Sequence, residues 1–89
     1  MQHRIPTPAA LAEAIRAVRK ASGVRQDDLA AQVGVSRQFA VDLESGKPTV
    51  QLGLVMRVLE ELGMQLSVEL PDEALRLLQT PSPKPQRRR

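Results

Sequence analysis

The sequence predicts an all-α domain of four or five helices, followed by a single C-terminal β-strand. Three observations support this prediction. Apolar residues recur every three or four positions through most of residues 8–63, as they do on the buried face of a helix. Glycines 23, 46 and 63 each stand where such a segment stops. After Gly63 the apolar residues alternate strictly with polar ones, which is the period of a strand.

The first predicted helix begins at Pro8, after a short leader of residues 1–7, and runs to about Ser22. Thr7 is a good N-cap, and proline at the first helical position loses no hydrogen bond. Gly23 supplies the stop. One face of this helix is apolar and carries Leu11, Ile15 and Val18.

Two short helices joined by a tight turn at Gly34 and Val35 follow. The first covers about residues 26–33 and turns Leu29, Ala30 and Val33 inward. The second has Ser36 as its N-cap, ends near Ser45, and turns Ala40 and Leu43 inward. This spacing predicts a helix-turn-helix, whose second helix lies in the major groove of DNA.

The fourth predicted helix starts at a Thr49 cap, ends at Leu62 and is apolar on nearly all sides. A helix of this kind is buried on more than one side. Two interpretations remain open: a central core helix, or a helix with the core on one side and a partner subunit on the other. Its main stripe is Leu52, Val55, Met56, Leu59 and Leu62, and its second is Leu54 and Val58.

The predicted strand covers residues 64–71 and ends at Pro71. The sequence offers no second strand, and an unpaired strand leaves backbone groups unsatisfied and favours pairing with another chain. We therefore predict a homodimer in which this segment pairs with its own copy, antiparallel about a twofold axis. The alternative is irregular extended chain. The residues expected to form the dimer contact are Met64, Leu66, Val68 and Leu70.

Two further segments complete the chain. Residues 72–79 predict a short helix with Leu75 and Leu78 on one side, and residues 80–89 predict a flexible, basic, proline-rich tail. This tail could contact DNA phosphates, dock on a partner protein, or serve only solubility. Acidic residues dominate residues 48–79, which suits contact with a protein better than contact with DNA.

The composition excludes several classes of function. Without cysteine the chain has no disulfide or thiolate zinc site, and one aromatic residue argues against a base-stacking surface. His3, the single histidine, lies in the leader, and there is no catalytic triad or phosphate-binding glycine loop. We expect no enzymatic activity, no metal and no cofactor. No apolar run approaches the roughly 18 residues that span a bilayer, so we expect a cytoplasmic protein without membrane contact.

The helix-turn-helix stretch resembles a known family, the Cro and phage-repressor (XRE) group, over about residues 8–63. This resemblance implies a lambda-repressor-like fold that binds double-stranded DNA. The residues that match the family frame are Gln26, Leu29, Ala30, Gly34, Val35, Ser36, Glu44, Gly46 and Lys47.

The following stretch narrows the resemblance to HipB-type antitoxins. It consists of residues 46–49, the apolar helix, residues 62–64 and one strand. The resemblance implies a homodimeric repressor that binds a palindromic operator, autoregulates its operon and neutralises a HipA-like serine/threonine kinase toxin. The alternatives are a solitary phage-type regulator without a toxin, and a protein-bridging module that uses the same fold.

Five residues are expected to contact DNA. Gln26 and Lys47 are expected to contact DNA phosphates. Ser36 begins the helix that enters the groove, where Arg37 can read guanine and Gln38 can read adenine. The resemblance also implies a structural salt bridge between Arg19 and Glu44.

Some positions depart from the family frame. Arg25 replaces the usual cap of residues 26–33, and Asp27 and Asp28 can compensate through the helix dipole. Phe39 has two interpretations, contact with a thymine methyl group or packing beneath the first helix. Asp42 receives no DNA role, because a carboxylate near phosphates is repulsive.

Overall fold

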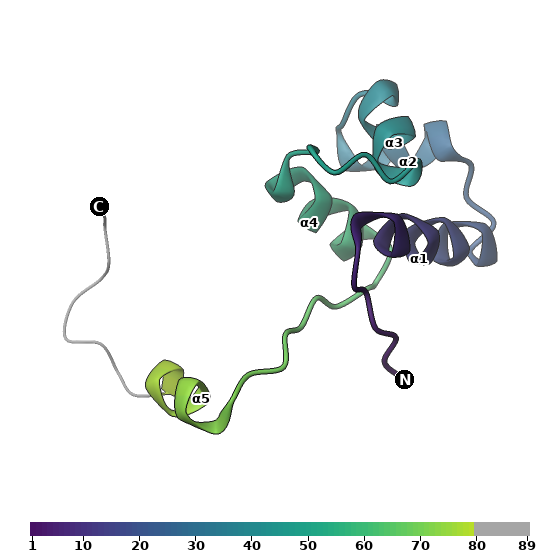
Figure 1. The fold of residues 1–89 in the computed structure, drawn as a ribbon. Helices are drawn as coiled ribbons and strands as arrows, with labels where there is room; N and C mark the ends of the chain where they lie inside the picture. Colours follow the sequence, from purple (N-terminus) through teal and green to yellow (C-terminus); the bar gives the residue numbers. More distant parts are fainter. Residues whose placement is uncertain (80–89) are drawn as a thin grey trace.

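The computed structural model describes residues 1–79, so the predicted tail of residues 80–89 lies outside the described residues. Residues 1–79 form five helices and no strand (Figure 1). The all-α helix-turn-helix fold is therefore confirmed. The helices are α1 (Pro8–Ala21), α2 (Gln26–Val33), α3 (Arg37–Glu44), α4 (Leu52–Glu61) and α5 (Asp72–Gln79).

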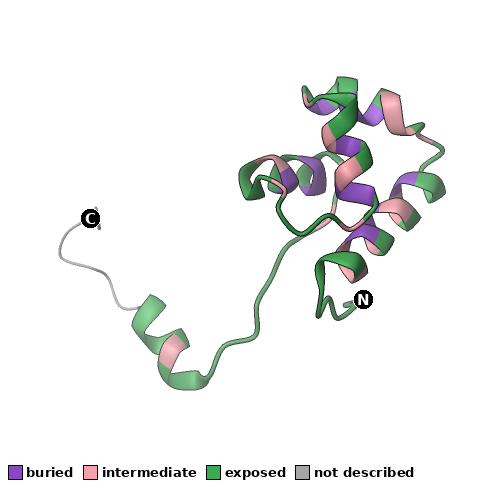
Figure 2. Ribbon diagram, turned by 45° about the horizontal axis from the view of Figure 1, so that its top comes forward, coloured by how far each residue is buried: buried purple, intermediate pink, exposed green. Residues whose placement is uncertain are grey.

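The helices α1 to α4 form one body around a common core. α3 packs against both α1 and α2, and α2 also packs against α4. Figure 2 shows that the buried residues all lie in these four helices. Ile15 and Val58 are the largest side chains that are fully buried. The buried core cluster is Ile15, Leu29, Val33, Leu43, Val55, Val58 and Leu59.

The predicted helix boundaries are mostly confirmed. The Thr7 hydroxyl accepts a hydrogen bond from the Ala10 N–H at 3.1 Å, and the Ser36 hydroxyl accepts one from the Phe39 N–H at 2.9 Å. Arg25 precedes α2 without a side-chain capping bond. The three glycines expected at helix ends, residues 23, 46 and 63, have positive φ angles.

The start of α4 corrects one prediction. α4 begins at Leu52 after Gln51, which makes no side-chain capping bond, so Thr49 is not the cap. Residues 48 and 49 form a turn, and Val50 packs half-buried against the core. Because Val50 packs against the core, the residues that the local sequence predicted as the start of this helix are not helical.

The apolar stripes of α4 divide between the core and the surface. Val55, Val58 and Leu59 are buried, whereas Leu52 and Met56 are 65% and 49% exposed. Burial within one chain therefore does not account for the whole apolar surface of this helix. The interpretation in which a partner subunit covers its outer side stays a prediction.

The segment that follows α4 leaves the body. Met64 remains half-buried, and its N–H donates to the Leu59 carbonyl oxygen at 2.8 Å. Residues 65–71, which we call the arm, are exposed and form no β-ladder within the described chain. A ladder needs a second strand, which one copy does not supply. The strand and the dimer therefore stay predictions.

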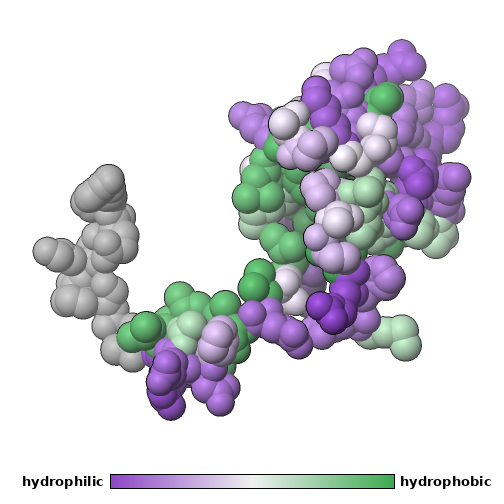
Figure 3. All heavy atoms as spheres, in the orientation of Figure 1, coloured by the Kyte–Doolittle hydropathy of each residue, from purple (hydrophilic) through white to green (hydrophobic). Residues whose placement is uncertain are grey.

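The predicted helix at residues 72–79 is confirmed as α5, which the arm holds away from the body (Figure 1). Its leucines are exposed, and Figure 3 shows apolar surface gathered on α5 and the adjoining arm. No helix of the described part has the length and apolar character required to cross a membrane.

Candidate nucleic-acid interface

The N-termini of α2 and α3 lie close together and frame an open hollow of about 200 Å³. Arg37 is exposed in the first turn of α3 and lines this hollow together with Gln26, the first residue of α2. A helix N-terminus presents unsatisfied N–H groups and the positive end of its dipole, so an anion is favoured here. The remaining lining residues are Arg25, Asp27 and Val41.

The side chain of Gln26 is anchored by a hydrogen bond to a buried residue. Its side-chain Nε2 donates to the Oε1 of buried Glu44 at 3.2 Å. One amide hydrogen is thereby committed, and the side chain is anchored beside the hollow. Contact with a phosphate is left to the other amide hydrogen and the backbone N–H of Gln26.

Arg19 and Glu44, the two residues expected to pair, form a buried two-point ion pair. Arg19 Nε donates to Glu44 Oε2 at 2.6 Å, and Arg19 Nη2 donates to Glu44 Oε1 at 2.9 Å. The side chains are only 10% and 4% exposed. The hydrogen bonds to Glu44 raise the pKa of Arg19 above the ordinary arginine value, although burial opposes the shift. The pair links α1 to the end of α3, so it is structural.

A second polar cluster, which the sequence analysis missed, surrounds Asp42. Gln38 Nε2 donates to Asp42 Oδ1 at 2.8 Å, and Lys47 Nζ lies 3.4 Å from Asp42 Oδ2. Gln38 and Lys47, both expected to contact DNA, are therefore brought together by a residue that received no role. The i to i+4 spacing of Gln38 and Asp42 on one helix was the available signal.

Ser36 and Phe39 are joined by the cap of α3. Because the Ser36 hydroxyl accepts from the Phe39 N–H, its own proton remains available to a phosphate oxygen. The Phe39 side chain is half-buried and packs against the core cluster. Packing, rather than contact with a thymine methyl group, is therefore the interpretation that the structure favours.

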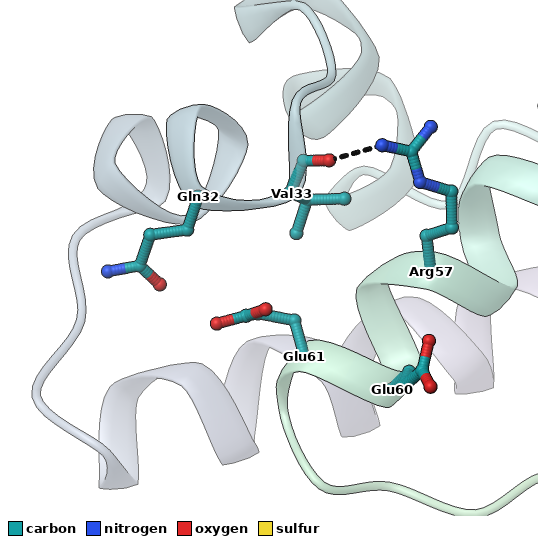
Figure 4. Close-up of a pocket in the computed structure, with 5 residues that line it drawn as sticks. All are labelled: Gln32, Val33, Arg57, Glu60 and Glu61. Atoms are coloured by element: carbon teal, nitrogen blue, oxygen red, sulfur yellow. Dashed lines mark hydrogen bonds between the residues drawn. The ribbon is translucent and has the colours of Figure 1, made fainter.

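A second hollow lies between α2 and α4 and measures about 240 Å³. In Figure 4 Arg57 reaches from α4 towards the end of α2, where its Nη2 donates to the Val33 carbonyl oxygen at 2.6 Å. This bond satisfies a carbonyl at the C-terminus of α2, a structural task. Gln32, Glu60 and Glu61 complete the lining. Across residues 1–79 no group of three acidic, histidine or cysteine side chains is placed to hold a metal ion.

Comparison with known proteins identifies the family. The family model described as helix-turn-helix matches residues 15–68, which is more than half of the chain. The chain belongs to this helix-turn-helix family. Within the family, a protein of Sinorhizobium fredii (strain NBRC 101917 / NGR234) is 48% identical over 73 residues. The match covers 82% of this chain and 96% of that protein, which is described as an uncharacterized HTH-type transcriptional regulator.

Solved structures of HipB show the same fold. The HipB–O4 20mer complex and the HipA–HipB–O2–O3 complex each contain a chain that matches with a TM-score of 0.70. Sequence identity is 24%, and the match covers 75% of this chain and 94% of the solved chain. At this identity the likeness shows the fold alone. This helix-turn-helix protein is thus a transcriptional regulator with the architecture of HipB.

Proposed function

We propose that this protein is a sequence-specific DNA-binding repressor that reads bases with the N-terminal half of α3. The observation that supports this most directly is the contrast between the two sides of that helix. Arg37 and Gln38 are exposed at its start, whereas Ala40 and Leu43 are buried in the core. A rigidly anchored helix with an Arg and a Gln at its free end fits direct readout in the major groove.

The surroundings of α3 supply groups for the DNA backbone. We assign phosphate contacts to the N-terminus of α2 with Gln26, to the Ser36 hydroxyl and to Lys47. Phosphate contacts of this kind fix the position of a protein on the duplex but do not select sequence. The hollow beside Arg37 also contains Arg25, although Asp27 pairs with that guanidinium at 3.0 Å.

Arg37→Ala tests the DNA-reading proposal. Selection from random duplexes first defines the preferred sequence of the unchanged protein, and binding to single-base variants is then measured. We expect Arg37→Ala to lose discrimination at one base pair of each half-site, by about 1–3 kcal/mol, while the circular dichroism spectrum is unchanged.

Lys20→Ala provides the matched control, because Lys20 is an exposed base in the last turn of α1 and lines neither hollow. Its base preference should equal that of the unchanged protein. Unaltered preference in Arg37→Ala would show that Arg37 does not read the bases.

We propose that two copies bind a palindromic operator, one α3 to each half-site. The exposed alternating residues of the arm support antiparallel pairing about a twofold axis, to which Met64, Leu66, Val68 and Leu70 contribute. A twofold protein matches a palindromic site, since each half presents the same surface. The exposed Leu52 and Met56 of α4 lie outside the core and are available to the same contact.

A second candidate function is that of a HipB-like antitoxin. It would autoregulate its operon and neutralise a HipA-like serine/threonine kinase. The structural neighbours favour it, because one of them is a complex that contains both HipA and HipB. The exposed leucines of α5, next to Asp72 and Glu73, offer a surface to such a partner. A solitary regulator and a protein-bridging module remain the competing functions.

Purification of the tagged protein from its native host separates these functions. We expect a stoichiometric kinase-like protein, identified by mass spectrometry, and its loss after combined Asp72→Lys and Glu73→Lys substitution. Glu13→Lys, an exposed charge reversal on α1, is the control and should retain the partner. Recovery of only this protein and DNA would leave a solitary repressor. Repression of a reporter behind its own promoter tests autoregulation.

A further inference from the structure

Asp42 occupies a position that is unfavourable for a carboxylate in two ways. It lies in the last turn of α3, where the negative end of the helix dipole repels an acidic side chain. It also lies on the helix that we place against a polyanion. The helix dipole and general DNA affinity would both favour a neutral residue here.

The Asp42 carboxylate determines how Gln38 presents its amide. A carboxylate only accepts hydrogen bonds, so the Gln38 nitrogen must face Asp42, as it does at 2.8 Å. The amide oxygen therefore points to the opposite side of the amide group. A free glutamine can rotate its amide to offer either end, and Gln38 has lost this freedom.

The fixed amide alters which bases the pair can accept. Asp42 uses one of the two Gln38 amide hydrogens, so the pair keeps one N–H donor. The amide oxygen and the carboxylate oxygens are acceptors, and acceptors therefore predominate on this surface. In the major groove adenine and cytosine present amino groups as donors. Guanine and thymine present acceptor oxygens at the corresponding positions. Acceptors facing acceptors repel each other.

We propose that Asp42 is a positioning residue that fixes Gln38 to select an amino-bearing base, adenine or cytosine, over guanine or thymine. This inference rests on the proposed DNA-reading function of α3. It restricts an unrestrained Gln38, which could offer either end of its amide, to one orientation, and it gives Asp42 a role in specificity.

Lys47 gives Asp42 a second and separable effect. Lys47 Nζ lies 3.4 Å from Asp42 Oδ2, so the carboxylate partly neutralises the cation that we assign to a phosphate. Asp42 therefore lowers affinity for any DNA sequence while it sharpens preference at one base pair. Removal of Asp42 should move the two quantities in opposite directions.

A double-mutant cycle tests the inference on the full chain, with duplexes that carry each of the four base pairs at every operator position. We expect Asp42→Ala and Gln38→Ala each to flatten preference at the same base pair of each half-site, by roughly 5- to 150-fold. The double variant should lose no more than Gln38→Ala alone. Asp42→Asn should flatten this base preference partly, because an asparagine amide can hydrogen-bond to either the nitrogen or the oxygen of the Gln38 amide.

Lys47→Ala is the matched control for the general effect. Asp42→Ala should strengthen binding to scrambled DNA, and adding Lys47→Ala should abolish this gain. Lys47→Ala alone should weaken binding to every sequence by a similar factor, because a phosphate contact does not select sequence. Alanine is compatible with α3, since it is the best helix former and the Asp42 side chain is not in the core.

The outcomes distinguish the inference from the function on which it rests. If Gln38→Ala flattens one position and Asp42→Ala flattens none, the positioning role is wrong and DNA reading by α3 stands. If the unchanged protein selects no preferred sequence, the DNA-reading function fails, and the positioning role fails with it.

Discussion

At the scale of single residues, Glu44 is the meeting point of three helices. Its carboxylate accepts from Arg19 of α1 and Gln26 of α2, while its backbone carbonyl accepts from Arg16 Nη1 at 2.8 Å. Arg19 in turn donates to the Val24 carbonyl oxygen at 2.9 Å. Because the charged groups are so well hydrogen-bonded, their burial is tolerated.

Glu44→Gln should strongly destabilise the fold. The change keeps the shape of the side chain but leaves the Arg19 charge buried without its counter-ion. We expect a loss of about 3–5 kcal/mol in the free energy of unfolding, measured by urea denaturation.

Asp27→Asn is the corresponding control, because it breaks an ion pair whose side chains are 77% and 41% exposed. An exposed pair contributes at most about 1 kcal/mol, so this variant should unfold almost as the unchanged protein does. Equal losses in the two variants would refute the structural role of the buried pair.

At the scale of elements, the end of α3 is fitted closely against the start of α1. Gly46 follows α3 with a φ of 88°, and a Cβ at this position would lie 3.2 Å from the Ala9 Cα. A side chain is therefore disfavoured both by the backbone conformation and by the neighbouring backbone. Gly53, inside α4, meets nothing within 4 Å of a built Cβ.

These two glycines should respond to alanine with opposite signs. Gly46→Ala should lower the free energy of unfolding by at least about 1 kcal/mol, because the residue must hold a left-handed conformation. Gly53→Ala should raise it by less than about 1 kcal/mol, because alanine favours the helix but Gly53 is only the second residue of α4. Thermal unfolding monitored by circular dichroism measures both. A stabilised Gly46→Ala would contradict the close approach of α3 to α1.

At the scale of the whole molecule, the chain divides into a packed body and an arm that carries α5. The body buries its apolar side chains, whereas Val68 on the arm is 75% exposed. In the predicted strand its neighbour Ser67 would point to the opposite face. The proposed pairing with a second copy would cover these exposed alternating residues.

Light scattering tests the dimer directly. We expect a mass of twice the 9.8 kDa of one chain at micromolar concentration. Val68→Asp should give the monomer mass, because a carboxylate would be buried where the two arms pair. Ser67→Asp, which places the same charge on the opposite face, should remain dimeric. A monomeric mass for the unchanged protein would refute the pairing of the arms.

The helices were predictable because their signals are local. Thr7 and Ser36 cap their own helices, and Gly23 ends one, without reference to the rest of the chain. The start of α4 was not predictable in this way, because Val50 packs against core residues that are distant in the sequence.

The sequence proposes the members of the candidate site but does not predict the contacts between them. Arg37 and Gln38 follow from the helix-turn-helix spacing. The anchoring of Gln26 by Glu44 depends on a residue 18 positions away, which only the fold brings near. The role of Arg57 is hidden for the same reason, because α4 meets the end of α2 only after packing.

The exposed arm has a consequence for the lifetime of the protein. Extended backbone that nothing covers is what a protease requires, so a cut within residues 65–71 would detach α5 and leave the body folded. Pairing of two arms would close that access. The cleavage rate should then fall as the protein concentration rises, because a larger fraction of the chains is paired. The protein would be degraded faster at low concentration than at high concentration.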